Sequence, residues 1–442
     1  MRKIMRQRLF VSFGLLMLIA VGLVFTAHTG TAQQETPTFI PTNTPRGTPA
    51  EATASPTATI TPTTIGPREF PDNINPLTGL PYPNEEARHR RTLILKISNF
   101  PEVVRPQYGL SFADIVYEYE VEGGVSRFAA FYRSHAPEMV GSIRSARLMD
   151  LELVNAYNAL LGYSGSNDWI REFILASDWK WRALSPQIGV NCPSFCRIRW
   201  DSRPFEHTLF ANTVAIWQEA ERRQVNEGMI ATGLAFNETP DPGGELANDI
   251  EIDWYSDRSL TRWQYNPEDN KYYRWDSGLP HIDAATGEQI TTDNVVILEV
   301  WHVDRPDVYE SEIGGIALEH QLWGTGGAWV FRDGRWYKGE WFRNRDRGGV
   351  YIRYMDEDKT PIMLRPGQTW FEIVRKFYIV NTEPLFSVTV REEYIDAEAT
   401  AVVQSEHLTS VPAATQTQFA EWYGSPTPSQ TWTPTPTGTW QN

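Results

Sequence analysis

Residues 113–132 read ADIVYEYEVEGGVSRFAAFY. From 115 to 122, apolar or aromatic side chains alternate with mostly acidic ones, and this period of two is typical of a half-buried β-strand. Gly123-Gly124 permits the positive φ angles of a tight turn, and the run at 127–132 predicts an antiparallel return strand. We expect a hairpin with Arg127 beside Glu122 and with three carboxylates on one face: Glu118, Glu120 and Glu122.

The residues around this hairpin predict a mixture of strands and helices. An apolar run at 93–97 indicates a buried strand before the hairpin. Apolar residues spaced three and four apart predict helices at 147–161, 168–176 and 211–225. We therefore expect an N-terminal α/β-type domain over residues 75–236.

A break rich in proline and glycine follows at 237–249, and beyond it only strand signals appear. Asp333-Gly334 lies between two aromatic-rich runs, which is a strong hairpin signal because Asp-Gly suits a tight primed turn. Further strands are expected at 295–303 and 370–374. The sequence thus predicts an α+β fold, in which the α/β-type domain precedes a mainly antiparallel β domain at 250–400.

Both ends of the chain predict segments outside the folded domains. Residues 1–32 carry basic residues and then an uncharged, mostly apolar run at 9–26, which indicates a signal peptide or a membrane anchor. Residues 33–74 are largely Thr/Pro-rich and predict a linker, and 424–442 predict a disordered tail of the same composition. We expect an extracytoplasmic protein that is membrane-anchored through 9–26 or secreted.

Charge and motifs exclude several classes of function. The formal net charge is −15, from 55 acidic and 40 basic residues, and such a chain is repelled by phosphate backbones, so we expect no nucleic-acid partner. The sequence contains neither a P-loop nor a dinucleotide-binding fingerprint, so we predict no cofactor. Local arginine clusters remain able to bind a small anion.

The chain has only two cysteines, Cys192 and Cys196. In an exported protein, a local disulfide is the first interpretation of this spacing. Zinc is the alternative, but it needs two further ligands, and no histidine lies close in sequence. We therefore predict a disulfide and no metal site.

Several short motifs, in order, resemble the signature of the YerB-like lipoproteins. They are NPLTGLP at 75–81, RPQ at 105–107, the hairpin itself and IRSAR at 143–147. The resemblance extends from about residue 75 to about residue 375. It implies a bacterial envelope protein whose domains are described only as being of unknown function. Members of that family usually carry a lipid-modified cysteine near the N-terminus, and this chain has none there.

The candidate site residues lie on or near these motifs. Paired carboxylates serve as general acid and base when burial separates their pKa values, which makes Glu118 and Glu122 catalytic candidates. Two guanidinium groups beside a helix N-terminus form an anion site. The ligand-binding candidates are Arg105, Arg127, Arg144, Ser145 and Arg147, and the four arginines are expected to converge with the two glutamates on one cleft.

Two further candidates come from loops. Ser164 lies in GYSGS at 162–166, which approaches a nucleophile elbow but ends in serine where that motif has glycine, so an anion-binding turn or a plain turn is favoured. The YerB-like family usually has a histidine near residue 207. The resemblance therefore implies a role for His207, against the alternative of a hydrogen-bonded loop histidine.

Three hypotheses of function follow. The first is a non-enzymatic protein that binds an anionic or sugar-containing envelope ligand at an arginine-lined cleft. The second is a hydrolase or transferase on envelope polymers, with Glu118 or Glu122 as acid or base and His207 as a helper. The third is a structural scaffold in which these polar residues join the two domains.

Overall fold

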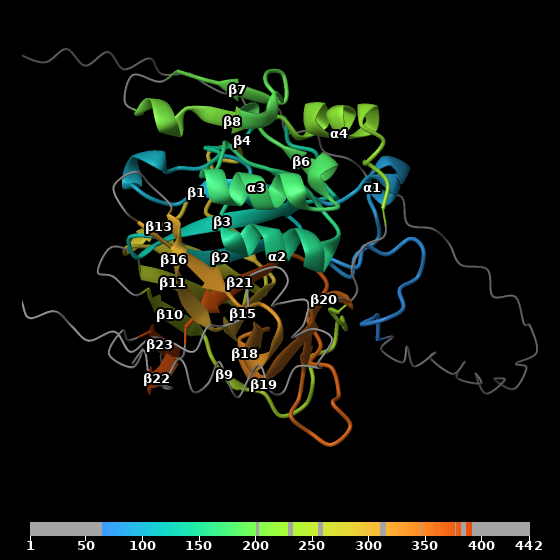
Figure 1. Cartoon of the computed structure of the whole chain (residues 1–442). Helices are drawn as coiled ribbons and strands as arrows, with labels where there is room; N and C mark the ends of the chain where they lie inside the picture. Colours follow the sequence, from blue (N-terminus) through green and yellow to red (C-terminus); the bar gives the residue numbers. More distant parts are fainter. Residues whose placement is uncertain are drawn as a thin grey trace, which may run out of the picture. The chain divides into compact units, whose positions relative to one another are not determined.

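The computed structural model describes residues 64–390 except 200–202, 229–232, 255–259, 310–314, 346, 376 and 382–385. The expected anchor at 9–26, most of the expected linker and the expected tail at 424–442 lie outside the described residues. The fold is α+β, with an N-terminal part of mixed helices and strands and a mainly antiparallel C-terminal part (Figure 1).

The N-terminal part contains four α-helices and the first eight strands of the described chain. The helices are α1 (Glu85–His89), α2 (Leu148–Tyr157), α3 (Asp168–Ala176) and α4 (Thr213–Arg222). The strands are β1 (Leu93–Ser98), β2 (Ile115–Val121), β3 (Val125–Tyr132), β4 (Val140–Gly141), β5 (Leu160–Gly162), β6 (Ala183–Leu184), β7 (Phe195–Arg197) and β8 (Leu209–Ala211). Short 3₁₀ turns connect them, among them η1 (Glu102–Val104) and η5 (Phe205–His207).

In the described residues, the C-terminal part is built from strands. They are β9 (Glu245–Leu246), β10 (Asp249–Asp253), β11 (Leu260–Asn266), β12 (Lys271–Asp276), β13 (Leu279–Pro280), β14 (Thr291–Thr292), β15 (Asn294–Glu299), β16 (His302–Tyr309), β17 (Ile316–His320), β18 (Gly324–Arg332), β19 (Arg335–Asn344), β20 (Arg347–Arg353), β21 (Thr369–Val374), β22 (Phe377–Asn381) and β23 (Phe386–Val390). Asp333 and Gly334 both have positive φ, as the β18–β19 turn requires. The single strand expected at 295–303 is instead two, β15 and β16.

One large sheet contains strands from both parts, in the order β20-β19-β18-β15-β21-β2-β3-β1-β5-β6. The two parts meet where β2 runs parallel to β21, and Glu118 pairs with Glu372 in this register. A second sheet has the order β13-β12-β11-β10-β23-β22, and a small one has the order β4-β8-β7.

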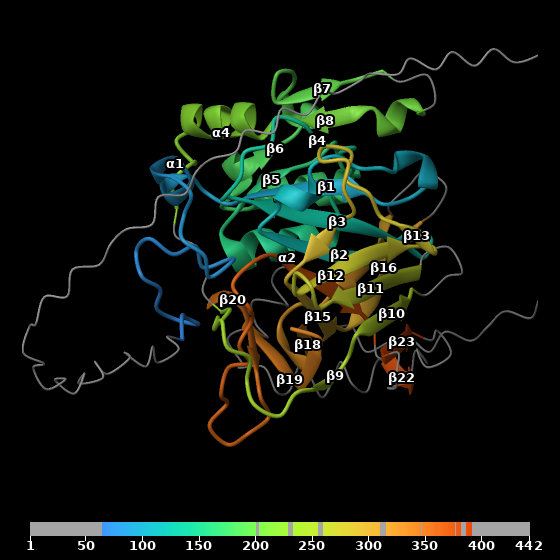
Figure 2. The same cartoon turned by 180° about the vertical axis from the view of Figure 1, so that it is seen from behind.

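Helices α2 and α3 cover one face of the large sheet, and the second sheet and helix α4 pack on the other (Figures 1 and 2). On the helical face, Tyr117 and Tyr119 of β2 share a core with residues of α2 and α3. On the opposite face, Val116 and Phe128 pack in a second core with Trp263 of β11. All seven residues of β2 are consequently buried, so the expectation of a half-buried hairpin strand is wrong. The alternation of side chains persists, but both faces are covered.

The start of α2 is fixed by its own first turn. The backbone N–H of Arg147 donates to Oδ2 of Asp150 at 2.7 Å, which satisfies a donor near the helix start and places a carboxylate close to the positive end of the dipole. The helix ends at Asn158, whose φ of 48° is left-handed. Arg147 is thereby held at the edge of the helical face, next to the end of β2.

Candidate functional site

The hairpin distributes the predicted site residues over two faces of the sheet. Ser126 and Arg127 are consecutive in β3, so their side chains point to opposite faces. Ser126 donates to Glu118 at 2.5 Å on the face of the second sheet. Arg127 contacts Glu122, the residue after the end of β2, on the helical face. The four arginines therefore do not converge with Glu118 and Glu122 on one cleft, because the sheet itself separates them.

Glu118 belongs to a buried network that joins the two parts of the chain. Its Oε2 pairs with Arg274 of β12 at 2.5 Å, and its Oε1 accepts from Asn99 at 3.2 Å. Its parallel neighbour Glu372 accepts from Nε1 of Trp263 at 2.9 Å. Burial raises the pKa of Glu372 well above its usual value, and the charge of Glu118 raises it further. Burial and the neighbouring carboxylate thus favour the neutral form of Glu372, while Glu118 is salt-bridged to Arg274.

The RPQ motif extends this network towards the surface. Nη2 of Arg105 lies 2.7 Å from Oδ1 of Asp276, and Gln107 is hydrogen-bonded to Nε2 of His281 at 2.7 Å. A cavity of about 390 Å³ opens against Arg105 and Asp276. We call Arg105, Glu118, Arg274, Asp276 and Glu372 the interface network. The oppositely charged partners of Arg105 and Glu118 lie more than 150 residues downstream, and nothing in the sequence motif indicated them.

On the helical face, Arg127, Arg144 and Arg147 form what we call the arginine cluster. Arg147 binds Glu122 with two contacts, of which Nε to Oε2 measures 2.7 Å, and Arg127 approaches the same carboxylate at 3.3 Å. Burial alone would raise the pKa of Glu122, but the hydrogen bond from Arg147 and the two positive charges outweigh it and lower this pKa to about 2. Glu122 is therefore a fixed anion that positions two of the guanidinium groups.

Arg144 differs from its neighbours. Its Nη1 donates to the backbone carbonyl of Glu206 at 3.3 Å, while its Nε is buried and has no hydrogen-bond partner among the described residues. Within the described part of the chain, no carboxylate lies within ion-pair distance of its guanidinium. Burial lowers the pKa of Arg144, and the nearby charge of Arg147 lowers it further. The group is thus a partly desolvated cation beside another cation.

His207 lies beside Arg144. Its side chain is only 4% exposed, and Nδ1 has no partner in the described structure. Burial lowers the pKa of His207 to about 4, and the charges of Arg144, Arg127 and Arg203 contribute to the shift. The imidazole is therefore neutral near pH 7 and senses a positive local potential. The sequence left two interpretations of His207: a functional residue or a hydrogen-bonded loop histidine. Because Nδ1 has no partner among the described residues, the second interpretation does not account for this atom.

Ser145 and Ser164 lie on adjoining loops of the same region. The carbonyl of Ser145 accepts from Arg127 at 3.4 Å, and the N–H of Ser164 donates to the carbonyl of Arg144 at 3.0 Å. Ser164 follows β5 and precedes α3, which is the strand–loop–helix order of a nucleophile elbow. The five residues between the two elements make a longer connection than that sharp turn, which argues against a nucleophile elbow. Ser164 instead lies on a loop that contacts the backbone of Arg144.

Beneath the arginine cluster lies a group of buried polar residues that sequence reasoning missed. The hydroxyl of Tyr119 donates to Asp150, and Nζ of Lys96 contacts this hydroxyl and lies 3.5 Å from the centre of the Tyr119 ring. Burial lowers the pKa of Lys96 to about 7, although Asp150 opposes the shift. The only sign in the sequence was a lysine inside the apolar run of β1.

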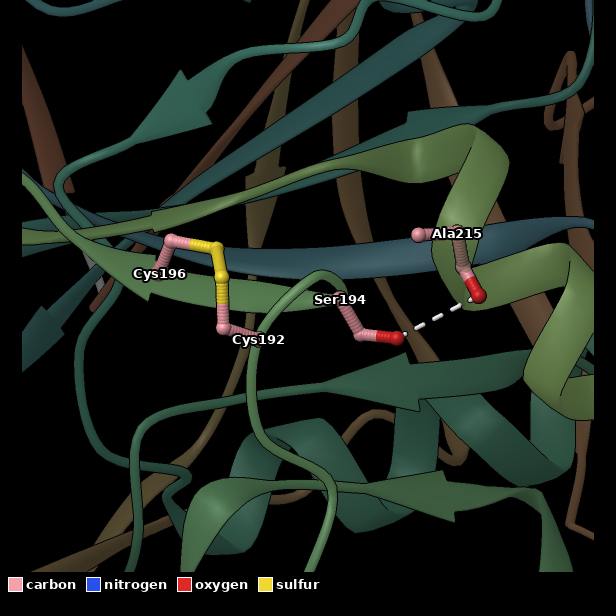
Figure 3. The surroundings of a disulfide bond; sticks show 4 residues. All are labelled: Cys192, Ser194, Cys196 and Ala215. Carbon is pink, nitrogen blue, oxygen red and sulfur yellow. Dashed lines mark hydrogen bonds between the residues drawn. A yellow bond between two sulfur atoms is a disulfide. The ribbon is translucent and has the colours of Figure 1, made fainter.

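Cys192 and Cys196 are joined by a disulfide that closes the turn into β7 (Figure 3). Between them, Ser194 donates to the carbonyl of Ala215 in α4 at 3.2 Å, so the turn is attached to that helix. Among the described residues, no group of three or more His, Cys, Asp or Glu side chains is arranged to hold a metal ion. In the same part of the chain, no helix has the length and apolar character of a membrane span.

Comparison with known proteins identifies relatives for most of this structure. Residues 77–226 match the N-terminal domain, and residues 250–371 the C-terminal domain, of a family described as "Protein of unknown function (DUF3048)". The "Putative lipoprotein YerB" of Bacillus subtilis (strain 168) is 26% identical over 306 residues, which cover 68% of this chain and 85% of YerB.

A solved structure supports the fold. The crystal structure of the YerB protein from Bacillus subtilis matches with a TM-score of 0.57 and 24% identity, over 69% of this chain and 97% of YerB. Both domains, the sequence relative and the fold agree. The chain therefore belongs to the YerB-like family of proteins with paired DUF3048 domains.

Proposed function

We propose that this protein is exported and binds an anionic ligand of the cell envelope at the arginine cluster. The observation that carries the proposal is Arg144, a partly buried guanidinium whose Nε is buried and has no partner among the described residues. Burying part of a cation without a carboxylate beside it is costly, and an anion that accepts its hydrogen bonds offsets that cost.

Three further features support an anion at this place. The unpartnered Nδ1 of His207 offers a second polar atom beside Arg144. Glu122 holds Arg127 and Arg147 in fixed positions, so the entropic cost of arranging the guanidinium groups is met before a ligand arrives. Burial is the main cause of the lowered pKa of His207, and the positive charges of nearby arginines add to it. These arginines form a local basic region in a chain of net charge −15.

Export rests on different observations. The basic residues and the apolar run at 9–26 have the pattern of a signal peptide or an anchor. The disulfide between Cys192 and Cys196 suits an oxidising compartment outside the cytoplasm. The relative in Bacillus subtilis is named as a lipoprotein. Together these features support a protein held at, or released from, the outer face of a membrane.

The test is a calorimetric titration of the full-length protein with sodium sulfate. Arg144→Gln keeps a long polar side chain but removes the charge, and we expect it to weaken sulfate binding about tenfold or more, because hydrogen bonds to charged groups contribute about 1.5–3 kcal/mol. The matched control is Arg222→Gln on α4, where an arginine 71% exposed pairs with Glu219 and no effect is expected. Sulfate binding that is the same in Arg144→Gln and wild type would refute the proposal.

Catalysis by Glu118, Glu122 and His207 is not favoured by this geometry. Glu118 is fully buried, salt-bridged and separated from Glu122 by the sheet. The pKa of Glu122 is about 2 and that of His207 about 4, both far below the range in which a general acid or base works near neutral pH. The role of joining the two parts of the chain, in contrast, fits Arg105 and Glu118, whose partners Asp276 and Arg274 are in the C-terminal part.

A further inference from the structure

Two segments contact the arginine cluster, the loop before α3 and the connection between β7 and β8, and each leads to or contains an exposed aromatic ring. The segment 143–147 is hydrogen-bonded on one side to Leu209, through the N–H of Ile143, and on another to Gly165, through the N–H of Ala146. The loop before α3 leads within a few residues to Trp169, which is 49% exposed. The loop between β7 and β8 contains Phe205, which is 64% exposed.

Phe205 is linked to Arg144 through the residue that follows it, and Trp169 is connected to the arginine cluster through the loop that precedes α3. Phe205 directly precedes Glu206, whose carbonyl accepts from Arg144, and one face of its ring is covered by the guanidinium of Arg197 at 3.8 Å. Trp169 is in the first turn of α3, two residues after the capping residue Asn167. Both rings are exposed, so they are available for contact with a ligand.

The groups on and beside the loop that precedes α3 are polar. Ser164 and Ser166 line the loop before α3, and Gln187 is hydrogen-bonded to Ser166 through both its carbonyl oxygen and its amide nitrogen. A lipid surface would favour apolar side chains that project together, whereas hydroxyl and amide groups among aromatic rings suit a ligand that presents hydroxyl groups and flat C–H faces.

On the basis of the proposed anion site, we infer that the ligand is an anionic sugar polymer: the arginine cluster binds its acidic groups, and Trp169 and Phe205 stack on its sugar rings. This assignment deepens the proposed function and depends on it. The added claim is that stacking on the two aromatic rings makes an anionic sugar polymer bind more tightly than a small inorganic anion.

The experiment titrates the full-length protein with sodium sulfate, an oligogalacturonate hexamer and a neutral cello-oligosaccharide of the same length. We expect the anionic hexamer to bind at least about tenfold more tightly than sulfate and more tightly than the neutral sugar. The double variant Trp169→Ala/Phe205→Ala should lose this advantage and still bind sulfate like wild type, which also shows that it is folded. Trp181→Ala, which removes a tryptophan 63% exposed elsewhere on the surface, should bind the hexamer normally.

Different failures point to different errors. If sulfate binds and depends on Arg144, but the hexamer binds no more tightly than sulfate or the double variant binds it like wild type, the sugar assignment is refuted and the anion site stands. The assignment is equally refuted if the double variant loses affinity for phosphatidylglycerol vesicles and keeps its affinity for the hexamer. If neither sulfate nor the hexamer binds, both proposals are refuted.

Discussion

Exchanging Glu118 and Glu372 for glutamine, one at a time, tests the charge balance of the interface network. The network holds three carboxyl groups and two guanidinium groups, all largely or fully buried. The raised pKa of Glu372 favours its neutral form, and with Glu372 neutral, two carboxylates face two cations. Glu118→Gln should leave the fully buried Arg274 without its closest anion, at a cost of roughly 3–5 kcal/mol of unfolding free energy.

Glu372→Gln is the matched control, since glutamine has the shape of the protonated carboxyl and makes no change of charge. We expect a cost within about 1 kcal/mol near pH 4.5, and at pH 7 Glu372→Gln should be at least as stable as wild type, measured by urea unfolding of the two variants and wild type. The sign of the pH effect follows from the raised pKa of Glu372. Its contribution is fully present below the pKa of an unfolded glutamate and decreases as pH rises towards the folded value.

Wild type should therefore lose stability relative to Glu372→Gln as pH increases from about 4.5, the usual value for this side chain. Equal destabilisation by the two substitutions at pH 7 would refute the argument. It would show that Glu372 is ionised and that the network carries a net negative charge.

Three further predictions concern the arginine cluster and the disulfide. Arg127→Ala should lower the unfolding free energy by only about 1 kcal/mol, because Arg147 still holds Glu122. Arg147→Ala should lower it by roughly 3 kcal/mol. Urea unfolding measures both, and a larger loss for Arg127→Ala would contradict the bond pattern. Sulfate affinity should stay constant between about pH 6 and 8, since the pKa of His207 is about 4, and a step near pH 6.5 in the calorimetric titration would contradict this neutral state. Cys192→Ser/Cys196→Ser should lower the unfolding free energy by roughly 2 kcal/mol in thermal unfolding, as expected for so short a loop, and an unchanged stability would show that the disulfide does not constrain the unfolded chain.

The expected strength of the Arg127 effect is smaller than the sequence suggests. From the hairpin alone, removing Arg127 would leave Glu122 as a stranded buried carboxylate. In the structure, Arg127 lies opposite Tyr119 in the β2–β3 register and reaches Glu122 sideways, while Arg147 provides the closer contacts. The second arginine comes from the start of α2, 25 residues later, and only the folded chain shows that it shares the carboxylate.

Local patterns predicted the elements of the fold well. The hairpin, its turn at Gly123-Gly124 and the helix after IRSAR follow from periodicity and backbone preference, which act between near neighbours in sequence. Pairing between distant strands has no such local signal. The sequence therefore gave no indication that β2 lies beside β21, or that Glu118 lies beside Glu372.

The same limit explains which of the predicted site residues lie together in the structure and which do not. Glu122, Arg127, Arg144 and Arg147 lie within a short stretch, and the structure brings them together. Arg105 and Glu118 were assigned to that group because they belong to the same motifs, yet their charges are matched by Asp276 and Arg274. Period-two alternation distinguishes the two faces of a strand, but it does not reveal what covers each face.

The pairing of β2 with β21 has a consequence for how the chain assembles. The polypeptide is synthesised from its N-terminus, so β2 can pair with β3 soon after both strands are made. The other edge of β2 has no hydrogen-bonding partner until residues 369–374 have been synthesised. Contacts of such sequence separation form slowly, and an open strand edge recruits other chains. A polypeptide truncated between the two halves would expose this edge, so we expect it to self-associate at concentrations where the whole chain stays dispersed.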